Sequence, residues 1–271
     1  MSNVSYLYCE LPAFIRKPIW KILHTIIISK DVGKEVVFMN YGYAYNGDAS
    51  SPPRLHARDE GDRYCIQLYD LVGGKPGDIS GKQVFEVGCG RGGGASYLTR
   101  YFGPSAYLGM DISHNVVSFC KKCHTTDNLS FMRGEAENLP LDDESVDTVV
   151  NVESSRCYSD KERFFREVYR VLKPGGTLLF ADMRAPDEVE LLEGHLRSNG
   201  FEITEKEDIT AGVVRALDED HHRRIEVMTR LTPWFLRRAV PDFAGVVNSN
   251  RYTSFVDGSM LYLRYRAEKR G

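Results

Sequence analysis

The sequence lacks a strong excess of either charge, and it contains no internal repeat and no low-complexity tract. Its 271 residues include 35 basic and 38 acidic side chains, which give a formal net charge of -3 and a pI near 6.2. A domain that is held on nucleic acid by phosphate contacts usually has a basic excess, so the composition argues against a nucleic-acid partner. With 42% apolar residues, the chain can bury the core of an ordinary globular protein.

Long hydrophobic runs are also missing. The most apolar N-terminal stretch, Ile22 to Ile28, contains His24 and is far shorter than the roughly twenty apolar residues that span a bilayer. No cleavage site of the Ala-x-Ala type follows it, as a secretory signal would require. We therefore expect a cytoplasmic protein, in which this stretch forms an amphipathic N-terminal helix that covers the protein body or makes a weak contact with a membrane surface.

The cysteines show no disulfide framework. All six are scattered through a long chain without a secretion signal, which favours free thiols. Cys120-Lys-Lys-Cys123-His124 formally matches a haem-attachment pattern, and its cysteine pair could also suggest zinc. A covalent haem needs an exported protein, and a structural zinc needs a second ligand pair, which is not found nearby. We therefore expect these side chains on the solvent side of an ordinary helix. No group of histidines and carboxylates has the spacing of metal ligands, and we predict no metal site.

The section from about Lys82 to Arg184 alternates short apolar runs with amphipathic segments, as strand-helix units of a parallel sheet do. Seven strands are predicted, at Gln83 to Val87, Ala106 to Met110, Leu129 to Arg133, Val146 to Val152, Thr177 to Ala181, Phe201 to Thr204 and Met260 to Tyr265. The pattern therefore predicts an α/β protein with a doubly wound, Rossmann-like core.

Three helices are predicted between the first five strands. The first covers Ala95 to Tyr101, and the second runs from a cap at Ser113 to about Cys123. The third begins near Asp160, because Ser159 and Glu162 have the spacing of a capping box, and it should end at the turn Lys173-Pro174-Gly175-Gly176.

The flanks of this core have a different character. Residues 1–80 contain turn-rich and aromatic pieces and are expected to form an N-terminal cover, whereas residues 81–184 form the cofactor-binding core. Residues 185–271 complete the sheet and include a largely helical insertion at about 209–258, before the last strand. Long insertions of this kind usually form lids or substrate covers.

The strongest local signal is the glycine-rich turn after the first strand, for which two interpretations compete. Gly88-x-Gly90-x-x-Gly93 satisfies the dinucleotide fingerprint, with Asp111 placed for a ribose, and would indicate an NAD-dependent oxidoreductase. Glu86-x-Gly88-x-Gly90-x-Gly92 is instead the form seen in class I methyltransferases that use S-adenosylmethionine. That cofactor carries an ammonium and no pyrophosphate, so an acidic residue before the glycines is useful. The two acidic residues could also have purely structural roles. Glu86 could form an ion pair with Arg91, and Asp111 could cap the helix that follows it.

Three further segments resemble the ubiquinone and sterol methyltransferase superfamily. They are the stretch from Gly134 to Asp147, the turn Val171-Leu172-Lys173-Pro174-Gly175-Gly176, and Asn40-Tyr41-Gly42-Tyr43. More narrowly, Gly92 to Arg100, Cys120-Lys121-Lys122 and Asn151 to Tyr158 are similar to the phthiotriol and phenolphthiotriol dimycocerosate O-methyltransferases, which methylate a hydroxyl of a long lipid-like polyketide. The resemblance implies a class I methyltransferase fold with a seven-stranded, mostly parallel sheet.

The resemblance also implies the cofactor site, with S-adenosylmethionine as the methyl donor. Residues expected at its methionine part are Glu86, Gly88, Cys89, Gly90 and Gly92. Asp111 and Ile112 would hold the ribose and adenine, and Glu135 with Ala136, where the family more often has Asp for Glu135, would lie at the adenine edge. Asn151 would lie beside the methyl donor, and Tyr41 and Tyr43 would close the pocket on its N-terminal side.

The chain departs from these relatives where a general base is expected. Many of them carry histidine after the fourth strand, in segments such as Glu-Ala-Ser-His-Cys-Tyr, whereas this chain has Arg156 and Cys157 there. An alcohol acceptor would be helped by a base within hydrogen-bond reach. The candidate residues are Glu153, Tyr158, His221 and His222, and the alternative is an acceptor acidic enough to need no strong base, such as a carboxylic acid whose anion Arg156 could hold.

We therefore expect an O-methyltransferase that acts on a hydroxyl of an apolar, lipid-like or polyketide acceptor, with help from the loop Glu153 to Tyr158. The acceptor pocket could be lined by apolar residues of the insertion, Trp234, Phe235, Leu236, Val240 and Phe243, although aromatic residues in a helical insertion more often belong to an ordinary core. The alternatives are C-methylation of a sterol or isoprenoid, an NAD-dependent oxidoreductase and a non-catalytic cofactor-binding protein. The sequence gives no indication of the oligomeric state.

Overall fold

A computed structural model describes residues 36–46, 52–232 and 244–270. The predicted N-terminal helix at Ile22 to Ile28, with its proposed membrane contact, lies outside these residues, as do the predicted pocket residues Trp234 to Phe243. Among the described residues, no helix is long and apolar enough to span a membrane.

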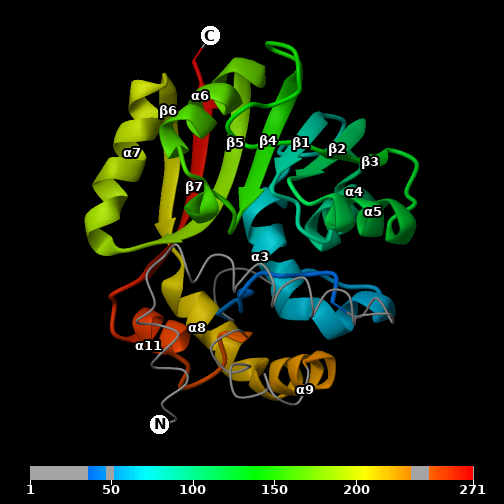
Figure 1. Cartoon of the computed structure of the whole chain (residues 1–271), viewed down its shortest axis with the longest axis vertical. Coiled ribbons are helices and arrows are strands. Elements are labelled where there is room, and N and C mark those ends of the chain that lie inside the picture. The colour runs from blue at the N-terminus through cyan, green and yellow to red at the C-terminus, as the bar shows by residue number, and fades with distance from the viewer. Residues whose placement is uncertain (1–35, 47–51, 233–243, 271) are drawn as a thin grey trace.

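A seven-stranded sheet with the order β3-β2-β1-β4-β5-β7-β6 forms the centre of the molecule (Figure 1). Its strands are β1 (Gln83–Val87), β2 (Ala106–Asp111), β3 (Leu129–Arg133), β4 (Val146–Val152), β5 (Leu172–Arg184), β6 (Phe201–Asp208) and β7 (Leu261–Lys269). The first five strands pair in parallel, and β7 is antiparallel to both β5 and β6. The predicted Rossmann-like, mostly parallel fold of a class I methyltransferase is confirmed.

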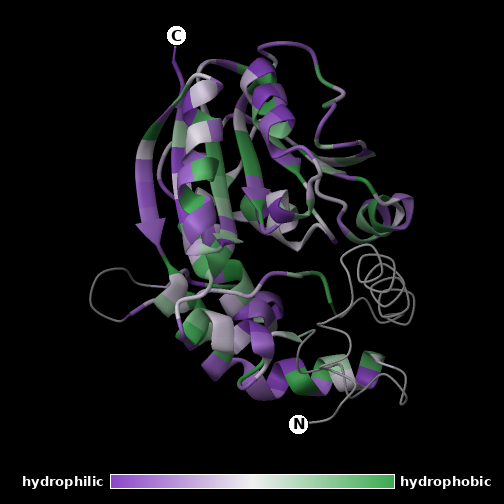
Figure 2. Ribbon diagram, turned by 60° about the vertical axis from the view of Figure 1, so that its left-hand side comes forward, coloured by the Kyte–Doolittle hydropathy of each residue, from purple (hydrophilic) through white to green (hydrophobic). Residues whose placement is uncertain are grey.

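Helices cover both faces of the sheet, because its central strands are apolar on both sides. Val84 and Val150 pack in one hydrophobic cluster with α3 (Arg63–Gly73), α4 (Gly93–Phe102) and α5 (His114–Cys123). Their neighbours Phe85 and Val149 point the other way and pack with α6 (Lys161–Val171) and α7 (Val189–Ser198), as the two-residue period of a strand dictates. The edge strand β6 is mostly hydrophilic (Figure 2).

Several caps, boundaries and elements differ from the predictions. The α6 cap is Asp160, whose carboxylate accepts a hydrogen bond from the Arg163 amide at 2.9 Å, whereas Ser159 bonds to Glu137, so the predicted capping box was wrong. Strand β5 begins at Leu172, before the glycine turn, because Leu172 already pairs with Val146 in β4. The sequence pattern also underestimated the length of β6 and did not predict α7.

The cover and the insertion lie together at the end of the sheet where β4 terminates (Figure 1). The cover contributes the 3-10 helix η1 (Ala57–Asp62) and α3, and the insertion contributes α8 (Thr210–Glu219), α9 (His221–Leu231) and α11 (Asn250–Val256). Backbone hydrogen bonds join them, since the Ala44 amide donates to the Gly212 carbonyl at 3.0 Å. The helical insertion before the last strand is therefore present as predicted.

Candidate active site

The glycine-rich turn follows β1 and leads into α4. Gly88, Gly90 and Gly92 have φ angles of 77°, 52° and 79°, in the left-handed region that favours glycine. A Cβ atom on Gly88 would lie only 1.9 Å from Ser154 Oγ, so the turn also packs directly against the loop after β4. These glycines are needed both for the shape of the turn and for this close approach.

Glu86 lies at the base of the turn and is fully buried. Its two carboxylate oxygens accept hydrogen bonds from Tyr69 Oη at 2.8 Å and from Tyr107 Oη at 2.9 Å. Burial raises the pKa of Glu86 to about 7, although both tyrosine hydroxyls act in the opposite direction. The guanidinium of Arg91 instead lies over the ring of Phe119, with 3.7 Å between Cζ and the ring centroid.

Asp111 ends β2 beside the turn. One of its oxygens accepts from the Gly90 amide at 3.2 Å and the other from the Ser113 amide at 2.9 Å, so the carboxylate ties the glycine turn to the start of α5. Burial raises its pKa, while the two amides act to lower it. The next residue, Ile112, is 61% exposed, which is unusual for a large apolar side chain and leaves it available to a flat apolar ligand.

The remaining predicted adenine contacts follow β3. Glu135 is exposed and Ala136 is buried, and the Glu135 carbonyl accepts a hydrogen bond from the Asn138 amide at 3.2 Å. The side chain of Glu135 is thus at the surface, and the backbone of this turn forms the wall behind it.

The segment Asn40-Tyr41-Gly42-Tyr43 is held from several sides. Arg224 in α9 donates to the carbonyl of Tyr41 at 2.8 Å and to that of Asn40 at 3.2 Å. Arg224 is itself paired with Asp220 at 3.0 Å. The Tyr43 amide donates to the Tyr64 carbonyl at 2.9 Å, which fixes the segment to α3. The insertion thus holds the cover in place.

The buried Asn151 and the half-buried Tyr158 form a polar pair beside the turn. Asn151 Nδ2 donates to the Val87 carbonyl at 2.8 Å and to Tyr158 Oη at 3.0 Å, and Tyr158 Oη also lies 2.7 Å from Ser154 Oγ. Burial raises the pKa of Tyr158 well above its ordinary value, so this phenol stays protonated. Asn151 Oδ1 is buried and has no hydrogen-bond partner among the described residues.

Glu153, another candidate base, occupies the left-handed region with a φ of 51°. A single oxygen, Oε1, accepts both the Tyr41 amide at 2.7 Å and Tyr262 Oη at 2.8 Å. Burial raises the pKa of Glu153, while Arg156 and the two donors act to lower it. The carboxylate therefore joins the core to the cover and to the last strand.

The two candidate histidines lie apart from this loop in the chain, at the start of α9. His221 Nδ1 accepts a hydrogen bond from the Val247 amide at 3.3 Å, and the ring of His222, which is exposed, stacks edge to face on that of His221. His221 thus has a structural partner within the insertion. A catalytic role for either histidine stays a prediction.

The Cys120-x-x-Cys123-His124 segment is placed differently from the prediction. Cys120 is fully buried, because it shares the inward face of α5 with Val116 and Val117, and its thiol donates to the Gly90 carbonyl at 3.3 Å. His124 Nε2 lies 2.8 Å from the Arg91 carbonyl. The segment therefore supports the back of the glycine turn.

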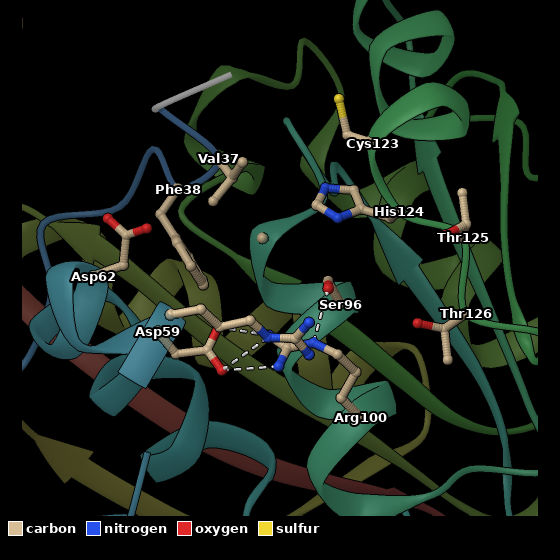
Figure 3. A pocket seen from close by; sticks show the side chains of 12 residues that line it. Val37, Phe38, Asp59, Asp62, Ser96, Arg100, Cys123, His124, Thr125 and Thr126 are labelled. Carbon is tan, nitrogen blue, oxygen red and sulfur yellow. Dashed lines mark hydrogen bonds and ion pairs between the residues drawn. The ribbon is translucent and has the colours of Figure 1, made fainter. Parts of the chain in front are cut away.

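A cavity of about 380 Å³ opens beside the first turn of α4 (Figure 3). Its walls include Phe38, Gly93 and His124, and Arg100 makes two hydrogen bonds of 2.8 Å to Asp59 at one side. None of the predicted cofactor or catalytic residues lines this cavity. It adjoins the glycine turn but is separate from the polar groups described above.

Several residues of the site were not recognised from the sequence, namely Tyr69, Tyr107, Tyr262 and Arg224. Each belongs to a different helix or strand from the carboxylate or carbonyl that it bonds, so no local motif contains it. One signal was present: Glu86 interrupts a strand that is otherwise apolar, and a buried carboxylate requires donors from neighbouring elements.

This arrangement is compatible with S-adenosylmethionine. The turn presents glycine backbone without side chains, Asp111 and the exposed Ile112 lie beside it, and the unpartnered Asn151 Oδ1 faces the same region from β4. No group of three or more His, Cys, Asp or Glu side chains that could hold a metal ion occurs in the described part of the chain.

Comparison with known proteins identifies the family of the chain. Residues 85–180 match the family model of a methyltransferase domain. The phthiotriol/phenolphthiotriol dimycocerosates methyltransferase of Mycobacterium tuberculosis is 38% identical over 92% of this chain and 91% of its own length. The fatty-acid O-methyltransferase of Mycolicibacterium smegmatis is 39% identical over 75% of this chain and 73% of its own length.

Solved structures show the same fold at lower identity. The cyclopropane synthase MmaA2 from Mycobacterium tuberculosis is 17% identical and superposes with a TM-score of 0.66, covering 86% of this chain and 92% of that one. The strand order, the glycine turn and the high identity to the curated relatives lead to one conclusion. The chain is a class I methyltransferase that uses S-adenosylmethionine as methyl donor, and it belongs to the family of the phthiotriol/phenolphthiotriol dimycocerosates methyltransferases.

Proposed function

We propose that this methyltransferase transfers a methyl group to an oxygen atom of a lipid-like or polyketide acceptor. The observation that carries the proposal is an identity of 38% and 39%, over 92% and 75% of the chain, to enzymes named for dimycocerosates and for fatty acids. Support comes from the cover and the insertion, which meet at the end of the sheet beside the glycine turn. This is where the family fold exposes its methyl donor to an acceptor.

The chemistry is an in-line displacement, for which S-adenosylmethionine, when bound, supplies the activated methyl group. The protein's task is to align the acceptor oxygen and to exclude water. The glycine turn and Asp111 hold the donor in our proposal, while Ile112 and Ala136 contact its flat base. Asn151, fixed by the Val87 carbonyl, directs its free Oδ1 toward the donor.

The cover completes the enclosure. Tyr41 is anchored by Arg224 on one side and by Glu153 on the other, so that closure of the N-terminal side depends on both the insertion and the core. Enclosure of this kind strengthens electrostatic interactions and protects the methyl donor from water.

A labelled-donor assay tests the proposal. Purified protein, S-adenosylmethionine with a radiolabelled methyl group and a total bacterial lipid extract should yield label in the organic phase. Asp111→Ala should reduce the label at least about tenfold, because a hydrogen bond to the ribose is lost. Asp127→Ala, at an exposed position in the turn before β3, is the matched control and should leave the label unchanged. Binding of S-adenosylhomocysteine without any lipid product would contradict the lipid acceptor while leaving the methyltransferase assignment in place.

A further inference from the structure

Arg156 lies on the loop after β4, two residues from Ser154, which packs directly on Gly88 of the glycine turn. An arginine stays charged and cannot act as a base. The loop beside the glycine turn therefore carries a fixed cation.

The nearest acidic group does not require this cation. Asp182 is fully buried and accepts hydrogen bonds from Ser155 Oγ at 2.7 Å, from the Arg156 amide at 2.9 Å and from the Met183 amide at 2.8 Å. Its ion-pair partner is Arg184, with Nη1 at 3.2 Å, whereas Arg156 Nε stays 4.0 Å away. Asp182 is thus satisfied by other donors.

The Arg156 guanidinium is left with weak partners. Nη1 donates to the thioether sulfur of Met183 at 3.4 Å, and Nε is buried without a hydrogen-bond partner among the described residues. Burial by itself lowers the pKa of Arg156, but the nearby Tyr41, Asp182 and Glu153 raise it overall, so the group is charged. The side chain as a whole is 30% exposed, so a ligand can reach it. A charged donor whose Nε lacks an acceptor is costly, and a guanidinium fits a carboxylate through two parallel hydrogen bonds.

The side chains that could act as a base already have hydrogen-bond partners, which favours an acceptor that needs no base. Glu153 Oε1 is occupied by two donors, Tyr158 is a half-buried phenol between Asn151 and Ser154, and His221 Nδ1 accepts from the Val247 amide. A carboxylic acid is ionised at neutral pH and needs no base, since it has no proton to lose before it attacks.

We propose that the acceptor is a long-chain carboxylic acid and that Arg156 binds its carboxylate beside the methyl donor, which makes the product a methyl ester. This inference rests on the proposed function and specifies which oxygen is methylated. One carboxylate oxygen donates an electron pair to the methyl carbon, and the carbon-sulfur bond breaks with its electron pair remaining on sulfur. A carboxylate and a sulfonium become a neutral ester and a neutral thioether, and no proton is released.

The change of charge gives Arg156 a second effect. The acid binds as an anion, whereas the ester is neutral and loses most of its attraction to the guanidinium. Arg156 therefore favours binding of the substrate over that of the product. Because the pairing is present before methyl transfer, its loss should raise KM more than it lowers kcat.

The test compares hexadecanoic acid with 1-hexadecanol as acceptors for the full-length enzyme. The acid should give an alkali-labile methyl ester, at a rate that varies less than about threefold between pH 6 and 9, and the alcohol should give little product. Arg156→Gln should raise KM for the acid by about 10- to 100-fold, with a smaller change in kcat. Arg156→Lys should restore part of the affinity for the acid, because lysine keeps the positive charge but lacks the two parallel N–H donors of the guanidinium.

Affinity for S-adenosylhomocysteine, measured by calorimetry on each variant, separates the possible failures. It should be unchanged in Arg156→Gln and in Arg197→Gln, an exposed arginine of α7 that serves as the control. An alkali-stable ether from the alcohol, or a KM for the acid that Arg156→Gln leaves unchanged, would overturn the carboxylate assignment. Cofactor binding without methylation of either compound would also overturn it, whereas loss of cofactor binding in the wild type would contradict the proposed function itself.

Discussion

Two glutamates, the fully buried Glu86 and the half-buried Glu153, belong to neighbouring strands of the sheet or to their ends, and they are bonded in different ways. Glu86 in β1 uses both oxygens, one for each of two tyrosines that lie only 17 and 21 residues away in the sequence. Glu153, just after β4, uses one oxygen for two donors that lie 112 and 109 residues away. Burial raises the pKa of both carboxyl groups.

The difference separates a preformed half of the site from an assembled half. The network of Glu86 belongs to β1, β2 and α3, the helix of the cover that packs on the sheet in the hydrophobic core, so the glycine turn is fixed within that core. The network of Glu153 exists only when the Tyr41 segment of the cover and the last strand have reached their final places. We expect variants at Glu86 to act on the core and on the cofactor, and variants at Glu153 to act on closure of the cover.

The largest effect is expected where the two halves touch. Gly88→Ala forces a left-handed φ on a residue with a side chain and places its Cβ against Ser154, which together should cost about 4 kcal/mol of stability. Gly81→Ala has a similar φ of 71° but open space around it, and should cost only about 1 kcal/mol. Urea unfolding of both variants measures the difference, and equal losses would mean that contact between the halves is unimportant.

The preformed half was the more predictable one. A glycine-rich turn, its preceding acid and the next acid at the end of β2 form a local pattern, because β1, α4 and β2 are consecutive elements of the chain. The doubly wound α/β core followed from the alternation of strands and helices. What could not be predicted was the set of partners, since Tyr69, Tyr262 and Arg224 reach the site through the folded topology alone.

Local propensity also failed at particular boundaries. Asp160 competes better than Ser159 for the start of α6, because the Ser159 hydroxyl is drawn to Glu137 on another segment. Likewise, the prediction that Cys120 lies on the solvent side of its helix was wrong, because its side chain belongs to the inward face of α5. Both errors arise from tertiary contacts that override a short-range pattern.

Glu86 should give the preformed half a pH dependence of its own. Its folded pKa of about 7 lies above the ordinary value near 4.5, so the native state binds the proton more tightly than the unfolded chain does. Stability from this group is therefore complete below about pH 4.5 and is lost as the pH rises toward 7 and beyond, by up to about 3 kcal/mol in total. Urea unfolding at pH 5 and pH 8 should show this loss in the wild type and not in Glu86→Gln. The exposed Glu162, changed to Gln, is the control and should keep the wild-type loss; a loss that persists in Glu86→Gln would assign it to other groups.

Glu153 should control the cover with a smaller effect on global stability. Glu153→Ala removes the acceptor for Tyr41 and Tyr262 and should cost about 2 kcal/mol, with about tenfold faster amide exchange at Tyr41. Glu153→Gly loses the same acceptor but relieves the left-handed φ of 51°, so it should be about 1 kcal/mol more stable than the alanine variant. Glu153→Gln keeps an oxygen at this position and should restore slow exchange. Amide exchange at Tyr41 that is equally slow in all three variants would mean that Glu153 does not hold the cover to the core.

The smallest effects isolate single hydroxyl groups. Tyr262→Phe and Tyr107→Phe each remove one donor from one of the two glutamates, and each should cost about 1 kcal/mol. The two losses are similar in size, but only Tyr262→Phe should accelerate amide exchange at Tyr41, because Glu153 alone holds both that amide and the Tyr262 hydroxyl. Tyr107→Phe should leave the cover unaffected, since Glu86 keeps its bond to Tyr69 within the core. Faster exchange at Tyr41 in both variants would mean that the two halves respond as one unit, and the distinction between a preformed and an assembled half would then fail.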